Sequence, residues 1–178
     1  VDEIDNRPFS PNAKGGYLTR ENVTVALLSF SAGLPILMTF STLSYWLGGY
    51  GGSREMIGLA SVLGLPYILK PLWAPFLDLF RPPLLGGLGR RKGWILFFQI
   101  LLFFIYIGLA HVTPDENLLI LGLLIFLLAF SSASQDIVID AFRIDYLSTE
   151  AQSYGASTYQ LFYRIAMLVM GAGAIWLS

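Results

Sequence analysis

Long apolar runs separated by short polar segments dominate the chain after residue 22. The runs cover roughly residues 23–47, 56–77, 93–113, 117–142 and 153–177. Each is near the length of about 20 residues that a helix needs to cross about 30 Å of hydrocarbon. Membrane β-barrel strands would instead show short segments that alternate between apolar and polar residues. The pattern therefore predicts an all-α, polytopic membrane protein with five spans.

Composition supports this class, since 55% of the 178 residues are hydrophobic and 13% are charged. The net charge is −1 and no basic stripe is present, which argues against a nucleic-acid partner. The chain has no cysteine and one histidine, so thiolate metal sites, disulfides and Cys/His nucleophiles are excluded within it. We expect no metal and no cofactor.

Residues 1–22 mix both charge signs with proline and glycine and lack the features of a signal peptide. We expect them to form an N-terminal tail.

The segment 78–92 contains four basic residues: Arg81, Arg90, Arg91 and Lys92. The positive-inside rule places this segment, and with it the N-terminus, in the cytoplasm. The chain begins at Val1 and its last apolar run reaches the end of the sequence, so we expect a piece of a longer protein.

Two basic residues lie within predicted spans, where a charge is costly unless it faces a partner or a wet cavity. Arg164 lies about 16 Å from the start of its span, and Lys70 about 10 Å from the cytoplasmic end of its own. Two buried cations predict an anionic ligand or paired carboxylates. The alternative is that the side chains extend along their stems to reach water.

The sequence SASQDIVIDAFRIDYL, residues 132–147, closes the fourth run with three aspartates and an arginine. Gln135 and Asp136 fall about 26 Å along this span, within the inner leaflet. Asp136, Asp140 and Arg143 share one helix face at i, i+4 and i+7. We therefore expect this face to point toward the protein interior.

Three interpretations of these acids remain open. Asp136, removed from water beside another acid, is a candidate to load and release a proton. Asp140 and Asp145 lie at or beyond the membrane boundary and are candidates for latches that pair with Arg90, Arg91 or Lys92. In the third interpretation, the Asp-xxx-Asp spacing matches the magnesium-binding motif of membrane prenyltransferases. That enzyme needs a second acidic motif, for which only Asp78 is available.

The segment from Asp78 through several glycines to the basic pair Arg90 and Arg91 resembles the signature of major facilitator transporters between their second and third spans. The insertion between the acid and the basic pair is longer here than in the usual pattern.

Five stretches together resemble the AmpG-type muropeptide permeases of Gram-negative bacteria. They are SFSAGLPILMTFSTLSYWL, KPLWAPFLDLF, GRRKGW, SASQDIVIDAFRIDYL and YRIAMLVMGAGAIWL, in order across residues 28–177. Acetyl-coenzyme A transporters share a similar Gln-Asp-Ile motif and are the nearest alternative.

The resemblance implies a 12-span major facilitator fold in the bacterial inner membrane, made of two six-helix halves. It implies proton-driven import of anhydromuropeptides (GlcNAc-anhydroMurNAc peptides) for peptidoglycan recycling, and no enzymatic activity. The chain would supply five spans of the N-terminal half, and the missing C-terminal half of its own chain would be its partner. A non-transporting membrane chaperone of the same superfamily is a further alternative.

A muropeptide presents sugar rings and carboxylates, so its path should offer amides, hydroxyls, aromatic faces and cations. The candidates for the substrate and proton pathway are Gln135, Asp136, Lys70, Arg164, Ser134, Tyr45, Tyr159 and Tyr163. Gly33 is also a candidate for this pathway, where it would let the first helix bend or approach a neighbour closely. The tyrosines have packing as an equal alternative. The candidates for a cytoplasmic gate are Asp78, Arg90, Arg91, Asp140, Arg143 and Asp145.

Overall fold

The structure is a computed structural model that describes residues 18–37, 64–83, 85–112 and 118–177. Six α-helices and two short 3-10 helices make up this part of the chain. Their order is α1 (Arg20–Leu37), α4 (Leu65–Ile68), α5 (Lys70–Leu79), η2 (Gly86–Leu88), α6 (Arg90–His111), α7 (Leu118–Tyr146), η3 (Thr149–Ala151) and α8 (Gln152–Leu177). The described residues include no strand, so the all-α prediction is confirmed for them.

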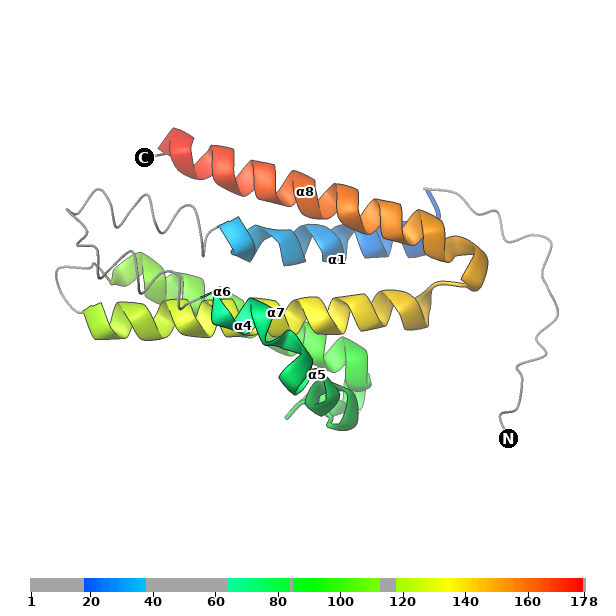
Figure 1. Ribbon diagram of the computed structural model, residues 1–178, viewed down its shortest axis with the longest axis horizontal. Coiled ribbons are helices and arrows are strands. Elements are labelled where there is room, and N and C mark those ends of the chain that lie inside the picture. Colours follow the sequence, from blue (N-terminus) through cyan, green and yellow to red (C-terminus); the bar gives the residue numbers. More distant parts are fainter. Residues whose placement is uncertain (1–17, 38–63, 84, 113–117, 178) are drawn as a thin grey trace.

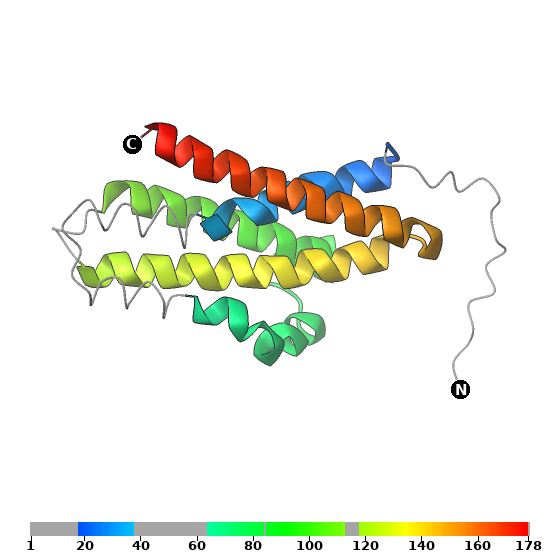
Figure 2. The same cartoon turned by 45° about the horizontal axis from the view of Figure 1, so that its top comes forward.

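The four long helices lie side by side along one axis (Figures 1 and 2). α8 packs along α1, α6 packs along α7, and α7 also contacts α1, α4 and α5. The colours in Figure 1 show that α7 runs opposite to α1, α6 and α8. α7 is therefore the central helix of the bundle, and its side chains meet four other elements.

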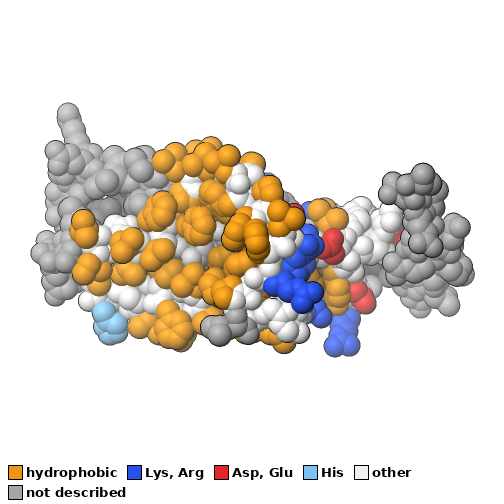
Figure 3. All heavy atoms as spheres, turned by 90° about the horizontal axis from the view of Figure 1, so that it is seen from below, with side chains coloured by type: hydrophobic (Ala, Val, Ile, Leu, Met, Phe, Trp, Pro, Cys, Tyr) orange, Lys and Arg blue, Asp and Glu red, His pale blue; other side chains and the backbone are white. Residues whose placement is uncertain are grey.

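Two helices are long and apolar enough to cross a membrane by their length and composition, among the residues described. They are α6 and residues Leu119–Tyr146 of α7. In Figure 3, apolar side chains cover the broad middle of the surface, and lysine and arginine gather with acidic side chains toward one end. This distribution suits a bundle whose middle faces an apolar environment.

The predicted second span, residues 56–77, differs from a single helix in its described part. α4 ends at Ile68, Leu69 is not helical, and α5 starts at Lys70. Pro71 explains the break, because its nitrogen has no N–H to donate to the carbonyl four residues back, and proline is favoured in the first turn of a helix, which is where α5 has it. Lys70 is thereby placed at the start of a new helix and not in the middle of a long one.

A buried apolar cluster joins α1, α5, α6 and α7 near the end of the bundle that carries the charges. Its fully buried members are Ala32, Leu77, Trp94, Ile95, Phe98, Val138, Ile139 and Phe142. The Trp94 indole N–H also donates to the carbonyl oxygen of Phe80 at 2.9 Å. This cluster fixes the start of α6 against α5 and α7, which positions the basic residues at that start.

α1 and α8 lie in close contact at Gly33. A Cβ atom added there would lie 2.5 Å from the carbonyl oxygen of Tyr163 and 2.9 Å from the Cβ atom of Ala166. Backbone atoms cannot move aside as a side-chain end can, so the contact requires glycine. The expected close approach of the first helix to a neighbour is therefore seen in the structure.

We predict that Gly33→Ala lowers the stability of the purified protein in detergent by about 1–3 kcal/mol, because it overpacks this contact. Gly122→Ala is the matched control, since a Cβ there meets nothing within 4 Å. Apparent melting temperatures of the two variants provide the measurement. Equal melting temperatures would show that the close packing of α1 on α8 is absent.

Candidate functional site

An ion pair between α5 and α7 lies at the centre of the candidate site. The Lys70 ammonium donates a hydrogen bond to Oδ2 of Asp136 at 2.7 Å. The Asp136 side chain is only 5% exposed, and the Lys70 side chain is 29% exposed. Lys70 thus pairs with a carboxylate of the chain itself, which is one of the two partners that we expected for a buried cation.

Aromatic side chains surround this pair. The Lys70 ammonium lies 5.4 Å from the centre of the Tyr67 ring, within the range of a cation–π interaction. Tyr159 and Tyr163 of α8 stack with ring centres 5.8 Å apart, and both interact electrostatically with Asp136. α4, α5, α7 and α8 therefore all contribute to one polar site inside an apolar bundle.

The two oxygens of the Asp136 carboxylate differ in their partners. Oδ2 binds Lys70, whereas the buried Oδ1 makes no hydrogen bond of good geometry within the described residues, and the Tyr163 hydroxyl interacts with the carboxylate from α8. A buried acceptor without a partner is costly, and such groups are expected where a ligand, water or proton binds. Oδ1 is therefore the position in this site that is suited to take up a proton.

Ser134, a predicted pathway residue, is held by its own surroundings. Its hydroxyl accepts a hydrogen bond from the Trp73 indole at 3.1 Å and donates to the carbonyl oxygen of Phe130 at 2.7 Å. Ser134 is fully buried. It ties α5 to α7 beside the ion pair, which makes it a positioning residue in this structure.

Gln135 points to the other side of α7, toward α1 and α6. Its side-chain amide donates to the Ser31 hydroxyl at 3.3 Å, and the Gln99 amide donates to the same hydroxyl at 3.4 Å. Gln135 is fully buried, and its Oε1 has no hydrogen-bond partner in the described part of the chain. Neutral polar groups therefore join three helices at the level of the ion pair.

Asp140 and Arg143 lie between the ion pair and the end of α7. Their charged groups are 3.7 Å apart, a loose pair within one helix, and the Arg143 guanidinium lies 5.4 Å from the Tyr159 ring centre. We expected Asp140 to pair with a basic residue of the segment 78–92. The structure pairs it with Arg143 instead, one turn along the same helix face, which is an interaction that the spacing of these residues also allows.

Arg91, at the start of α6, joins three elements at the charged end of the bundle. It donates to the Asp78 carboxylate at the end of α5, and to Oδ2 of Asp145 near the end of α7 at 3.0 Å. Arg90 donates to the backbone carbonyl of Asp78. Of the three basic partners considered for Asp145, the structure selects Arg91.

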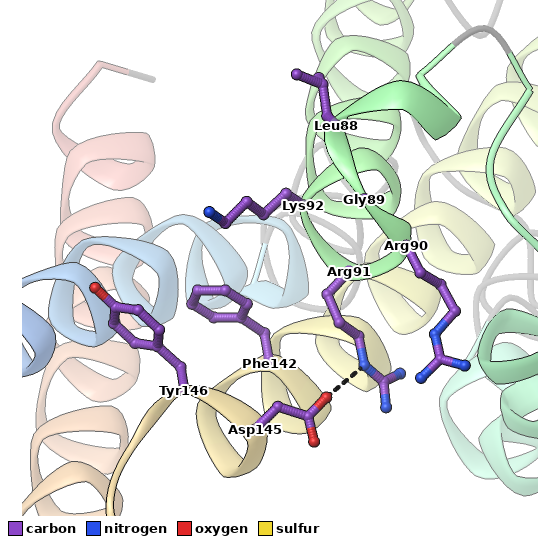
Figure 4. Close-up of a pocket in the computed structure, with 8 residues that line it drawn as sticks. All are labelled: Leu88, Gly89, Arg90, Arg91, Lys92, Phe142, Asp145 and Tyr146. Carbon is purple, nitrogen blue, oxygen red and sulfur yellow. Dashed lines mark hydrogen bonds and ion pairs between the residues drawn. The ribbon is translucent and has the colours of Figure 1, made fainter.

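The same end contains an open hollow of about 270 Å³ (Figure 4). Its lining comprises Leu88, Gly89, Arg90, Arg91, Lys92, Phe142, Asp145 and Tyr146. Gly89, with φ of 91°, has the left-handed conformation that glycine adopts most easily, and it turns the chain into α6. Figure 4 shows Arg91 and Asp145 facing each other across the base of this hollow.

Arg164 corrects one expectation. We predicted a cation buried in the middle of its span, but Arg164 is exposed on α8. The reason is that α8 packs on α1 through the face that carries Ala166, which is buried beside Gly33, and Arg164 lies on another face. Tyr45, a further predicted pathway residue, lies outside the described residues.

Sequence reasoning missed four residues of the site, namely Tyr67, Trp73, Ser31 and Gln99. Tyr67 and Trp73 lie three positions before and after Lys70, a spacing that would bring their rings beside Lys70 on the single helix that the sequence predicted. Gln99 is the one amide within the apolar stretch 93–110. These signals were present, but aromatic and small polar residues are common in any span.

A buried ion pair inside apolar helices is typical of membrane transport proteins. Comparison with known families supports this class, because the family model described as acetyl-coenzyme A transporter 1 matches residues 23–119. The chain belongs to this family of membrane transporters.

The chain is also similar to proteins named as permeases and AmpG transporters. It is 40% identical over 152 residues to the anhydromuropeptide permease of Escherichia coli, covering 85% of this chain and 30% of the relative. It is 36% identical over 154 residues to a Rickettsia felis protein named "Putative transporter AmpG 4", covering 86% of this chain and 37% of that relative. The chain thus spans about a third of the length of these relatives.

We predict that Arg91→Gln opens the charged end of the bundle. A single cysteine introduced as Leu77→Cys, in a background without other cysteines, would report on access to the buried cluster beneath Arg91. Loss of two partly exposed ion pairs, together worth about 1 kcal/mol, should speed its labelling by a water-soluble maleimide about fivefold. Lys92→Gln is the control, and equal rates in both variants would contradict the role of Arg91.

Proposed function

We propose that the protein is a proton-coupled importer of anhydromuropeptides, which are GlcNAc-anhydroMurNAc peptides, from periplasm to cytoplasm. The observation that carries this proposal is the buried pair of Lys70 and Asp136, which provides a cation for a carboxylate and an acid for a proton. The relation to a permease of that name supports the choice of solute.

We further propose that the chain contributes five spans of the N-terminal six-helix half of a 12-span major facilitator fold, with its N-terminus in the cytoplasm of a bacterium. The opposite direction of α7 relative to α6 and α8 supports successive crossings of the inner membrane (Figure 1). The basic segment 78–92 supports the orientation. The remaining helices would come from the missing half.

In this proposal Asp136 carries the proton and Lys70 meets a carboxylate of the peptide. Tyr159 and Tyr163 offer aromatic faces to the sugar rings, and Gln135 offers an amide. Arg164 supports a larger assembly, because an exposed guanidinium near the middle of a span is costly against lipid. It would face the path or the second half of the protein.

The network of Asp78, Arg91 and Asp145 is proposed as the cytoplasmic gate. It joins the ends of α5 and α7 to the start of α6, so parting these ends requires breaking the bonds to one guanidinium. Arg90 supports the network through its bond to the Asp78 carbonyl. Asp140 and Arg143 occupy the passage between this gate and the ion pair.

A proton gradient suffices as the driving force. One proton moving down a pH difference of one unit gains about 1.4 kcal/mol, which corresponds to about tenfold accumulation of solute. This contribution does not depend on the charge that the solute carries.

Transport of acetyl-coenzyme A is the second candidate, favoured by the description of the matching family. It is also an anionic solute, so Lys70 suits both. The prenyltransferase alternative is weaker, because Asp136 and Asp140, the two acids of its motif, each face a basic side chain of the chain itself.

We predict that the full-length protein in proteoliposomes accumulates labelled GlcNAc-anhydroMurNAc-tetrapeptide when the outside is acidic. A protonophore should abolish accumulation, because it removes the driving force. Excess acetyl-coenzyme A should leave uptake unchanged. Uptake that is the same with and without the gradient would refute proton coupling. Uptake of labelled acetyl-coenzyme A with no uptake of the muropeptide would favour the second candidate.

A further inference from the structure

We propose that the solute and the proton enter this site together by exchange at Lys70. A carboxylate of the solute takes the place of the Asp136 carboxylate on the Lys70 ammonium, and the released Asp136 takes up one proton at its carboxylate. The inference rests on the proposed function and assigns the step that couples its two ligands. No covalent bond other than the new O–H bond forms.

In a buried site, entry of the solute carboxylate and the proton together is more favourable than entry of either one alone, because only joint entry keeps the site neutral. In the structure, the ammonium and the carboxylate sum to zero. A solute carboxylate entering alone would leave a net charge of −1, and a proton alone would leave +1. An uncompensated buried charge is strongly destabilising, whereas entry of both ligands keeps the sum at zero.

The two partners differ in exposure in the way that exchange requires. Lys70 is 29% exposed, so a solute can reach its ammonium, whereas Asp136 is 5% exposed and enclosed. The helix break at Leu69 lies directly before Lys70, where it frees this residue from the hydrogen bonds of a continuous helix. The solute therefore meets the cation first, and the acid is reached by a proton.

Side chains on the neighbouring helices interact with the site both when Lys70 pairs with Asp136 and when the solute and the proton are bound. α4 supplies Tyr67, whose ring interacts with the Lys70 cation and continues to do so when Asp136 leaves. α8 supplies Tyr159 and Tyr163, which interact electrostatically with Asp136. On α7 itself, Asp140 lies one helical turn from Asp136 and carries a charge of the same sign.

The remaining charged and polar neighbours do not compensate a change in the charge of the site. Arg143 on α7 is engaged with Asp140 and the Tyr159 ring. At this level, the Gln135 amide of α7 donates to the Ser31 hydroxyl of α1, which also accepts from the Gln99 amide of α6, and all three side chains are neutral. Compensation for a solute anion must therefore come from a proton.

Exchange has a thermodynamic signature. Because binding is reciprocal, one proton taken up per solute bound makes the solute affinity depend on pH with unit slope. The dissociation constant should rise about tenfold per pH unit over the range in which free Asp136 is ionised. Neutral solutes should show no such slope, since they leave the ion pair intact.

The test measures binding of GlcNAc-anhydroMurNAc-tetrapeptide to the full-length protein in detergent, by calorimetry between about pH 5 and 8. We expect unit slope in the unmodified protein and in Asp136→Glu. Asp136→Asn should bind the tetrapeptide with no pH dependence. The same tetrapeptide with its carboxylates converted to methyl esters should bind weakly and without a slope.

Two further variants test whether a lost pH dependence arises from misfolding or from any change of charge on the protein. The double variant Lys70→Gln with Asp136→Asn keeps the site neutral and should lose both the slope and the preference for the free carboxylates. Glu150→Gln, in the exposed η3, is the surface control and should keep unit slope.

The outcomes separate this inference from the proposed function. Binding of the tetrapeptide with no slope in the unmodified protein would overturn the exchange and leave the muropeptide permease standing. A slope that persists in Asp136→Asn would also overturn it, because the proton would then bind elsewhere. Failure of the tetrapeptide to bind at any pH would overturn the proposed function, and the exchange with it.

Discussion

The ion pair of Lys70 and Asp136 is the interaction on which the site depends. Removing two charges from water is expensive, and the cost is recovered only when they meet in good geometry. The 2.7 Å contact meets this condition and holds α5 against the central helix α7. Ser134 and Trp73 add a second tie between the same helices beside it. Apolar contacts alone leave the relative position of two helices poorly specified, and these polar contacts fix the position of α5 along α7.

The charges along α7 separate into two sites with different chemistry. Asp136 is enclosed and faces a single cation, so its charge depends strongly on what occupies the site. Asp145 is half exposed and shares Arg91 with Asp78, so solvent screens it and the bonds can break at low cost. α7 therefore has a strong interaction in the interior and a weak one at its end, which is the arrangement that the proposed binding site and the proposed gate require.

The sequence predicts the kinds of residue in the site better than their partners. Lys70 and Asp136 were identified separately because charges are rare in apolar runs, but they are 66 positions apart and only the packing of α5 on α7 joins them. For Arg164, helix spacing predicts the depth but not the facing direction, which the packing of α8 decides. Tyr67 was missed because an aromatic residue in a span looks the same whether it packs or binds a cation. The helix break at Leu69 follows from Pro71, yet proline alone does not distinguish a kink from an end.

A double-mutant cycle on Lys70 and Asp136 tests the central claim most directly. The unfolding free energy of the purified protein would be compared for Lys70→Met, Asp136→Leu and the double variant. We predict that each single change costs about 3 kcal/mol by leaving one charge uncompensated, and that the double variant loses less than the sum, with a coupling of at least about 1 kcal/mol. Additive losses would show that the two side chains do not interact, and would contradict the account.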